Sequence, residues 1–309
     1  MNDAIVRLRA NISSVFLGKA ETIDRVVCCL LARGHLLIED VPGVGKTILA
    51  TAIARSIDCS FTRIQLTPDM LPSDVLGVSV LDRDSGEFRF KRGPIFANIV
   101  LADEINRTTP RTQSAMLEAM NEASVSIDGQ TMALSQPFMV IATQNPYEFE
   151  GTYPLPENQL DRFLMRTHLG YPSTEDEVRV LELRPALTAI NQLEPVLTRD
   201  ELLGLQRAVD EVRVEKSLLD YIVAFANATR EHEAMRVGLS PRGSLALAQA
   251  ARARAVYQGR DYVIPEDITV NIAPVCMHRV VTKAHLVNGS ARTIERVLIE
   301  VLEQIDSPA

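Results

Sequence analysis

The sequence predicts an α/β protein, with a core built on a parallel β-sheet that carries inserted β-hairpins, followed by a smaller all-helical domain. Two apolar segments read as buried parallel strands that run into polar sequence, at residues 35–47 (HLLIEDVPGVGKT) and 98–107 (NIVLADEINR). From about residue 173 only helical periodicity continues. We therefore expect a core at residues 1–172 and a helical domain at 173–309, since one hydrophobic core seldom holds 309 residues.

The elements of the core follow in order. Two helices precede the first strand, and the second of them is amphipathic from Glu21 to Arg33. Further helices are predicted at 47–57 and 110–122, and further strands at 62–66 and 138–142. One inserted hairpin pairs 78–81 with 87–90 around the turn DRDSG, and a second pairs 124–127 with 131–134 around Asp128-Gly129, a dipeptide suited to positive φ angles.

The helical part is predicted from its start signals. A Ser or Thr followed three residues later by Glu forms a capping box, and Ser-Pro opens a helix as cap and first-turn proline. These signals are Thr174 with Glu177, Thr198 with Glu201, and Ser240 with Pro241.

Composition excludes several classes of protein. Hydrophobic residues are 46% and charged residues 23%, and a net charge of −8 works against a broad DNA-binding face. No apolar stretch is long enough to span a membrane, and we expect no signal peptide. The four cysteines include no C-x-x-C pair and the five histidines lack metal-ligand spacing, so we expect free thiols, structural histidines and a cytoplasmic location.

The first apolar strand enters a loop that is suited to bind phosphate. Its backbone N–H groups, bent at two glycines, can surround phosphate oxygens, and the following helix directs its positive end at the same place. Asp40 stands where the strict motif has glycine, but an Asp tolerates turns and can bond backbone N–H groups, so the loop can still form. The residues expected to bind nucleotide here are Asp40, Val41, Pro42, Gly43, Val44, Gly45, Lys46, Thr47 and Ile48.

The second strand ends in two carboxylates. Asp103 is placed to hold Mg²⁺ together with the Thr47 hydroxyl, and Glu104 to activate an attacking water. Asn145 follows a third strand. Because ligands sit at the carboxyl ends of parallel strands, Asn145 belongs beside Lys46 and Asp103. Together these residues predict a site that splits a nucleoside triphosphate.

The chain resembles the AAA+ ATPases and, within them, the MoxR family. The resemblance extends from about Val15 to Leu302 and is carried by EDVPGVGKT, FTRIQLTPDMLPSDVLGV, LADEINRTTPRTQSAMLEAMNE, VIATQNPYEFEGTYPLPENQLDRF and LSPRGSLALAQAARARA. The two hairpins resemble those of the branch that includes magnesium chelatase subunits and MCM-type helicases. The resemblance implies a P-loop AAA+ core followed by a helical lid.

The resemblance also implies roles for single residues. Lys46 and Thr47 resemble the Walker A contacts, Asp103 and Glu104 the Walker B pair, and Asn145 the sensor 1 that orients the hydrolytic water. These roles make ATP and Mg²⁺ the expected cofactors.

Two arginines resemble residues that sense nucleotide between subunits. Arg162 resembles the arginine finger, which reaches the nucleotide of a neighbouring subunit, and Arg242 resembles sensor 2, whose side of the interface stays open. A ring, expected to be a hexamer, follows from an arginine supplied by a neighbour. Phe16 and Leu17 match the segment that lies near adenine, although apolar core residues would look the same.

The function implied by the resemblance is ATP hydrolysis that drives chaperone-like remodelling, maturation or cofactor insertion in a client complex, together with a von Willebrand factor A domain protein. One alternative is a DNA-acting motor or a chelatase-like subunit, but neither hairpin tip is basic, and nucleic acid is not the expected partner. Another is a non-catalytic nucleotide-sensing scaffold, which the presence of Glu104, Asn145 and Arg162 disfavours. The client is not specified by the sequence.

Overall fold

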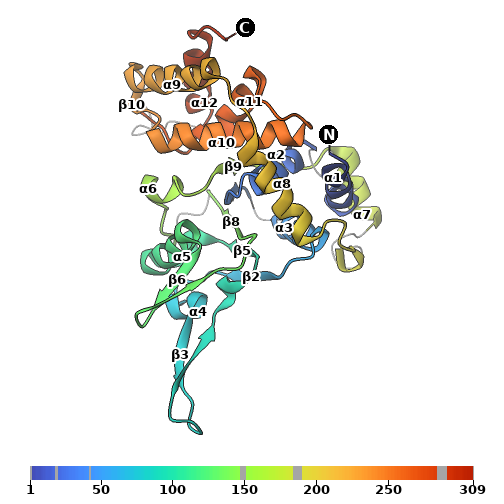
Figure 1. The fold of residues 1–309 in the computed structure, drawn as a ribbon, viewed down its shortest axis with the longest axis vertical. Coiled ribbons are helices and arrows are strands. Elements are labelled where there is room, and N and C mark those ends of the chain that lie inside the picture. Colours follow the sequence, from blue (N-terminus) through green and yellow to red (C-terminus); the bar gives the residue numbers. More distant parts are fainter. Residues whose placement is uncertain are drawn as a thin grey trace.

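The computed structural model of the chain describes residues 2–17, 20–41, 43–146, 151–183, 190–283 and 291–308. Helices gather at one end of the molecule, a sheet flanked by helices forms the middle, and one β-hairpin projects from the other end (Figure 1). The sheet and its flanking helices position the residues that the sequence singled out.

The main sheet has five parallel strands in the order β2-β5-β8-β1-β9. The central strands β1 and β5 are buried at every residue, as expected for apolar strands covered on both faces. The strands are β1 (Leu36–Glu39), β2 (Phe61–Gln65), β5 (Ile99–Asp103), β8 (Met139–Gln144) and β9 (Met165–Thr167). Four of these were predicted, whereas β9 was not, because three residues carry too little pattern.

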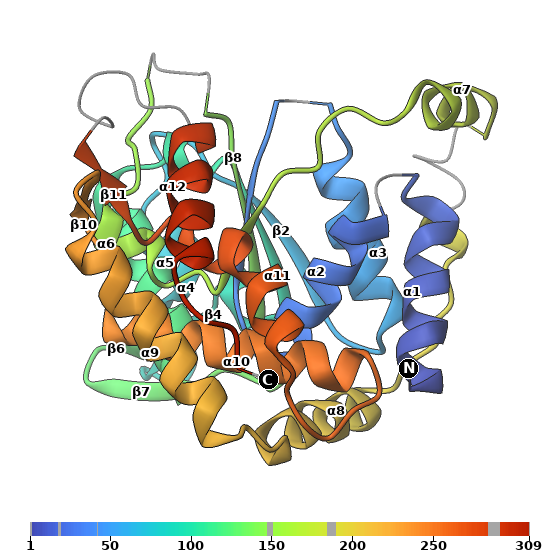
Figure 2. The same ribbon diagram turned by 90° about the horizontal axis from the view of Figure 1, so that it is seen from above.

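Helices cover both faces of this sheet. Figure 2 shows α1 (Asp3–Val15), α2 (Ala20–Leu31) and α3 (Lys46–Ser56) on one side and α5 (Pro110–Glu122) on the other. Side chains of successive strand residues enter different cores: Leu36 and Ile38 belong to the cluster with α1 to α3, and Leu37 to the cluster with α5. The continuous apolar strands therefore build two cores at once.

Both predicted hairpins are present. β3 (Gly77–Leu81) pairs with β4 (Phe88–Arg92), and β6 (Ser124–Ile127) pairs with β7 (Gln130–Ala133). Asp128 and Gly129 have φ angles of 51° and 76°, as a tight hairpin turn requires. The short helix α4 (Pro72–Leu76) leads into the first hairpin.

The remainder of the chain is mainly helical. Besides helices it contains a small antiparallel sheet of β10 and β11, which sequence patterns did not indicate. The remaining elements are η1 (Pro94–Phe96), η2 (Ile105–Arg107), α6 (Glu157–Leu160), α7 (Thr174–Leu183), η3 (Ile190–Gln192), α8 (Arg199–Glu211), α9 (Lys216–Glu231), β10 (Met235–Val237), α10 (Pro241–Tyr257), α11 (Pro265–Cys276), β11 (Val281–Thr282) and α12 (Ala291–Glu303).

Two of the three predicted helix starts are confirmed. Thr198 forms a reciprocal capping box with Glu201, and the Ser240 hydroxyl accepts a hydrogen bond from the N–H of Gly243. The predicted box at Thr174 is wrong, because Thr174 is the first helical residue and Ser173 is the cap, accepting from the N–H of Asp176 at 3.1 Å. Ser173 and Thr174 are both good helix caps, so the sequence did not determine which of them is the cap.

The helical part packs directly on the core. Buried residues of α8 and α10 belong to the same apolar cluster as α1, α2 and α3, so the cluster is continuous across residue 172. The predicted domain boundary at residues 172 and 173 stays a prediction. No helix within the described ranges is both long and apolar enough to cross a membrane.

All four cysteines are free thiols, as predicted. Burial raises the pKa of Cys28 and of Cys276 to about 12, and it also raises the pKa of Cys29. Cys59 is only partly buried, and its pKa is raised to about 11 by the same cause. The three buried thiols are therefore protonated and shielded from reagents in the folded chain, whereas Cys59 is protonated but partly accessible.

Candidate nucleotide-binding site

The glycine-rich loop follows β1 and leads straight into α3. Gly43 and Gly45 have φ angles of 88° and 93°, which side chains rarely tolerate, so the loop needs glycine at both positions. Backbone bent in this way directs successive N–H groups to one point, and α3 begins at Lys46 with its positive end toward it. Pro42 lies outside the described residues. This geometry is suited to phosphate.

Asp40 fixes the start of the loop. Its Oδ2 atom accepts hydrogen bonds from the N–H groups of Leu169 and Gly170, both at 2.7 Å, and its Oδ1 atom accepts from the N–H of Val41 at 2.9 Å. The carboxylate thus ties the loop to the segment that follows β9. The departure from the glycine motif therefore has a structural use, and the predicted bonding to backbone N–H groups is present.

The remaining loop residues set the position of the lysine. The Nζ atom of Lys46 donates to the carbonyl oxygen of Asp40 at 2.7 Å, across the mouth of the loop. Val44 and Ile48 pack against the core beneath. The ring of Phe16 lies 3.4 Å from where a Cβ on Gly45 would stand, which is ordinary van der Waals contact, so the requirement for glycine comes from its φ angle of 93°.

Asp103 ends β5, which is separated by β8 from the strand that enters the loop. It is 7% exposed, its Oδ1 atom accepts from the Thr143 hydroxyl, and its Oδ2 atom accepts from Arg63 at 2.6 and 3.2 Å. Carboxylate and hydroxyl oxygens are ligands that Mg²⁺ prefers. Asp103 and Thr47, in the first turn of α3, therefore supply oxygen atoms of the kind that this ion takes.

Glu104 is held in a strained backbone conformation. Its φ and ψ angles of 58° and 53° are left-handed, which costs a residue with a side chain about 1–2 kcal/mol. Its N–H donates to the Thr143 hydroxyl at 2.9 Å, and its Oε2 atom accepts from Gln65 at 2.9 Å and pairs with Arg107 at 3.2 Å. These contacts hold the carboxylate at the edge of the sheet.

Asn145 directly follows β8, which lies between β1 and β5. It is 6% exposed, and its carbonyl oxygen accepts from the Asn106 side chain at 3.3 Å. Below it Glu39 accepts from Gln144 at 3.1 Å and pairs with Arg166 at 3.2 Å, so neighbouring strand ends are cross-linked. Since the strands are parallel, the loop, both carboxylates and Asn145 meet at one edge.

Arg162 lies near the amino-terminal ends of the parallel strands, opposite the end that carries the loop. Two residues after it, the N–H of Leu164 bonds the carbonyl oxygen of His35, just before β1, whereas Asp40 comes just after β1. His35 and Asp40 are five residues apart in extended chain, which is about 16 Å at about 3.3 Å per residue. The backbone at Arg162 therefore lies at the opposite end of β1 from the phosphate loop of its own chain.

Asp161, the residue before Arg162, joins this edge to the helical part. Its Oδ1 atom accepts from Arg279 at 2.8 Å, and its Oδ2 atom pairs with Arg242 at 3.4 Å. Arg242 also donates to Asn121, at the end of α5, at 3.0 Å. Arg242 thus lies beside Arg162 and away from Lys46. The Nη1 atom of Arg162 is buried with no hydrogen-bond partner among the described residues.

Several residues around the carboxylates escaped prediction. Arg63 and Gln65 lie on β2, and Thr143 lies on β8. The sequence did contain a pattern that could have indicated Arg63 and Gln65. They are polar, lie two residues apart near the end of a predicted strand, and so share one face of it, where they can reach the end of a neighbouring strand. Which neighbour they face depends on the strand order, which the sequence does not state.

The arrangement agrees with known proteins. Residues 35–165 match the family described as ATPase family associated with various cellular activities (AAA), and residues 227–297 match an AAA lid domain. The chain is 54% identical to the Bacillus subtilis protein YeaC over 258 residues, which are 84% of this chain and 81% of YeaC. It is 42% identical to chaperone MoxR1 of Mycobacterium tuberculosis over 279 residues, 87% of this chain and 74% of that protein.

Similarity in three dimensions extends over the whole chain. A crystal structure of a candidate ATPase from Cytophaga hutchinsonii matches with a TM-score of 0.89 at 35% identity, covering 99% of this chain and 96% of the other. The core, the inserts and the helical part therefore recur together in a solved structure.

Proposed function

Because this chain belongs to the MoxR family of AAA+ ATPases, we propose that it hydrolyses ATP in the presence of Mg²⁺ and uses the energy to remodel partner protein complexes. One observation carries the proposal: Lys46, Asp103 and Glu104 meet at one edge of the sheet, and Arg162 lies at the other. The chain thus offers two half-sites that a neighbouring copy can complete.

The first half-site binds and positions the nucleotide. The loop amides and Lys46 take the phosphate oxygens, and Thr47 and Asp103 hold the metal ion. Bound Mg²⁺ neutralises charge on the phosphate oxygens. Glu104 accepts the proton of the attacking water, and Asn145 orients that water from the adjacent strand end. The Thr143 hydroxyl serves both carboxylate residues, since it bonds Asp103 and the N–H of Glu104.

The second half-site supplies positive charge to the neighbour. Arg162 acts as the arginine finger, and Arg242, which shares Asp161 with this edge, acts beside it across the same interface. Contacts of this head-to-tail kind close into a ring, for which we propose a hexamer. Without the finger, hydrolysis falls by about 10³- to 10⁵-fold.

Mixing two inactive variants tests the arrangement. Arg162→Ala keeps its nucleotide half-site but lacks the finger, and Glu104→Gln keeps the finger but lacks the base. Each alone forms rings that bind ATP without turnover. In an equal mixture about a quarter of the interfaces combine the two intact halves, so we expect about a quarter of wild-type ATPase activity. Arg236→Ala, at an exposed arginine on β10, is the matched control and keeps full activity.

If Arg162 served its own chain, the mixture would stay inactive, because neither variant would contain a complete site. Full activity of assembled Arg162→Ala rings would also contradict the assignment.

The relative named chaperone MoxR1 supports a chaperone-like use of the energy. We propose that the ring matures or rearranges a client complex in the cytoplasm, where its free thiols stay reduced, and that a von Willebrand factor A domain protein assists it. Purification of the Glu104→Gln form from cells, with ATP bound and not turned over, identifies such partners by mass spectrometry.

A further inference from the structure

Arg279 follows α11 in the helical part of the chain, yet its guanidinium binds the segment that contains Arg162. Its Nε atom donates to the Asp161 carboxylate at 2.8 Å, and its Nη2 atom donates to the carbonyl oxygens of Asp161 and Phe163 at 3.2 and 2.7 Å. Its Nη1 atom donates to the carbonyl oxygen of Leu164 at 3.0 Å. One side chain of the helical part therefore holds the backbone on both sides of Arg162.

Every N–H group of the Arg279 guanidinium has an acceptor. Its Nη1 atom also donates to the carbonyl oxygen of Val275, on α11, so that all five N–H groups are used. The side chain is 3% exposed, and its stem packs on the first turn of α10, where a Cβ on Gly243 would lie 3.3 Å from the Cδ atom of Arg279. A buried charge is costly to displace from its partners. Arg279 therefore fixes one geometry between α10, α11 and the segment around Arg162.

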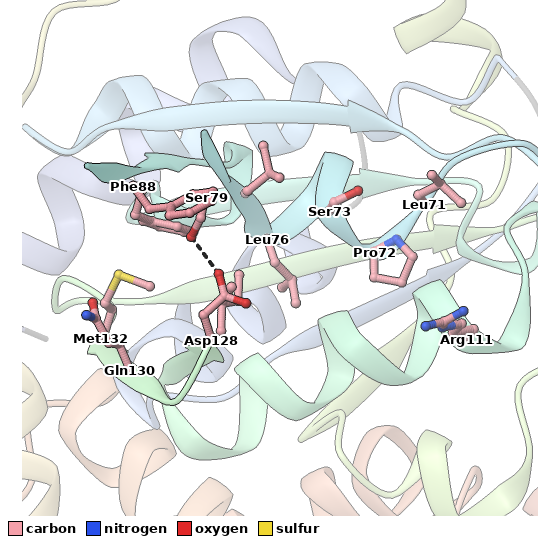
Figure 3. Close-up of a pocket in the computed structure, with 14 residues that line it drawn as sticks. Leu71, Pro72, Ser73, Leu76, Ser79, Phe88, Arg111, Asp128, Gln130 and Met132 are labelled. Atoms are coloured by element: carbon pink, nitrogen blue, oxygen red, sulfur yellow. Dashed lines mark hydrogen bonds between the residues drawn. The ribbon is translucent and has the colours of Figure 1, made fainter. Parts of the chain in front are cut away.

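This buried contact differs from contacts at the surface. The two inserted hairpins, for comparison, are joined by a hydrogen bond of 2.6 Å from the Ser79 hydroxyl to the Asp128 carboxylate, beside an open groove (Figure 3). Water can reach that bond and replace either partner, so it holds the hairpins only weakly. The guanidinium of Arg279 is shielded from such exchange, and its bonds can therefore set the position of a backbone segment.

Arg162 itself is held through its backbone. Its N–H donates to the carbonyl oxygen of Gln159, in α6, at 3.2 Å. Its Nη1 atom, in contrast, is buried with no hydrogen-bond partner among the described residues. The position of the Arg162 guanidinium therefore depends on the backbone from which its side chain starts, and this is the backbone that Arg279 holds.

We propose that Arg279 is a positioning residue for hydrolysis in a neighbouring copy, because it fixes the backbone from which Arg162 reaches the neighbour's nucleotide. The inference rests on the proposed role of Arg162 as the arginine finger. The backbone that Arg279 holds lies at the opposite end of β1 from the loop of its own chain. A change at Arg279 should therefore leave its own nucleotide half-site intact and impair the site that its finger completes. A displacement of about 1 Å can cost about 10²-fold in rate.

A purely structural role of Arg279 leads to a different expectation. If Arg279 only joined the helical part to the core, its loss would weaken every ring that contains the variant, whichever copy lies beside it. A positioning role confines the defect to the finger side of each interface, so an intact neighbour can correct it. Mixed rings therefore distinguish the two roles.

The test uses Arg279→Lys, which keeps the charge but lacks the planar fork and so cannot hold all the same acceptors. We expect kcat of the ATPase to fall by about 10²-fold, with KM for ATP and the Kd of a fluorescent ATP analogue within about twofold of wild type. An equal mixture with Glu104→Gln should recover about a quarter of wild-type activity, since Glu104→Gln supplies an intact finger. An equal mixture with Arg162→Ala should recover none, because neither variant supplies a correctly placed finger.

Two further variants complete the test. Arg236→Lys, the same substitution at an exposed arginine on β10, is the matched control and should keep wild-type kcat. Asp161→Asn removes the charge that Arg279 faces but keeps an oxygen acceptor, so we expect a smaller fall in kcat, of about tenfold, and the same result in both mixtures. Circular dichroism and light scattering verify the fold and the ring of each variant, and Asp161→Asn carries the test if Arg279→Lys does not assemble.

The proposal is overturned if Arg279→Lys rings keep wild-type kcat, or if they lose activity and the mixture with Glu104→Gln stays inactive. A large rise in KM or in the Kd of the analogue would also overturn it, since the effect would then lie in the variant's own nucleotide half-site. Failure of the proposed function shows separately, as an inactive mixture of Arg162→Ala with Glu104→Gln. If that mixture is active and the mixture of Arg279→Lys with Glu104→Gln is not, only the positioning role is wrong.

Discussion

Replacing Asp40 by glycine tests whether the glycine motif or the hydrogen bonds of the Asp40 carboxylate better predict the stability of the loop. The motif has glycine at this position, so by motif alone Asp40→Gly should be harmless or beneficial. In the structure the Asp40 carboxylate accepts from the N–H groups of Leu169 and Gly170. We therefore expect the variant to be less stable and to bind ATP more weakly.

The magnitude follows from these bonds. A hydrogen bond to a charged group contributes about 1.5–3 kcal/mol. Leu169 is 4% exposed, so its N–H has little access to water once the carboxylate is gone, whereas Gly170 is only partly buried and water can replace its partner. Together the loss should be about 2–4 kcal/mol, a large part of a net stability of about 5–15 kcal/mol.

Urea unfolding followed by circular dichroism measures this loss, and a fluorescent ATP analogue measures affinity. Asp40→Asn is the matched control, since it keeps one carbonyl acceptor without the charge and should lose about half as much. The affinity should fall because the Lys46 amine bonds the carbonyl oxygen of residue 40, which the carboxylate holds in place. An Asp40→Gly protein with wild-type stability and affinity would refute this reasoning.

Further predictions concern thiols, metal and pH. In the folded protein at pH 8 Ellman's reagent should modify at most Cys59, whereas guanidinium exposes all four thiols. Arg63→Ala removes the cation that occupies Asp103, so half-maximal ATPase activity should need about two- to fivefold less Mg²⁺. Burial lowers the pKa of His35 from 6.5 to about 4, so the unfolded chain binds a proton that the folded chain does not, and the free energy of unfolding falls by up to about 3 kcal/mol as pH drops through this window. Urea unfolding of His35→Gln should show a smaller fall.

The loop and the strand of the first half-site were predictable because their residues are neighbours in the chain. Gly43, Gly45 and Lys46 indicate a loop of the kind that binds phosphate, and Asp103 and Glu104 follow a strand whose burial is visible in its composition. Local backbone geometry places these groups, so local sequence is enough to find them.

Contacts between distant segments were not predictable in the same way. That Asp40 bonds residues 169 and 170 follows from β9 lying beside β1, and β9 is too short to leave a pattern. The position of Arg242 beside Asp161 likewise depends on how α10 packs, which no periodicity specifies. Strand order and helix packing are therefore the features that could not be predicted from the sequence.

The two arginines that hold Asp161 differ in strength, and this difference determines how the helical part can move. Arg279 is 9% exposed and also donates to the carbonyl oxygens of Phe163 and Leu164 at 2.7 and 3.0 Å, so breaking its contacts would leave a buried charge unpaired. The Arg242 side chain is 53% exposed and its pair is 3.4 Å long, a contact of about 0–1 kcal/mol. Arg242 can therefore leave Asp161 at little cost, as its proposed role at a neighbour's nucleotide requires, while Arg279 keeps the backbone beside Arg162 in place.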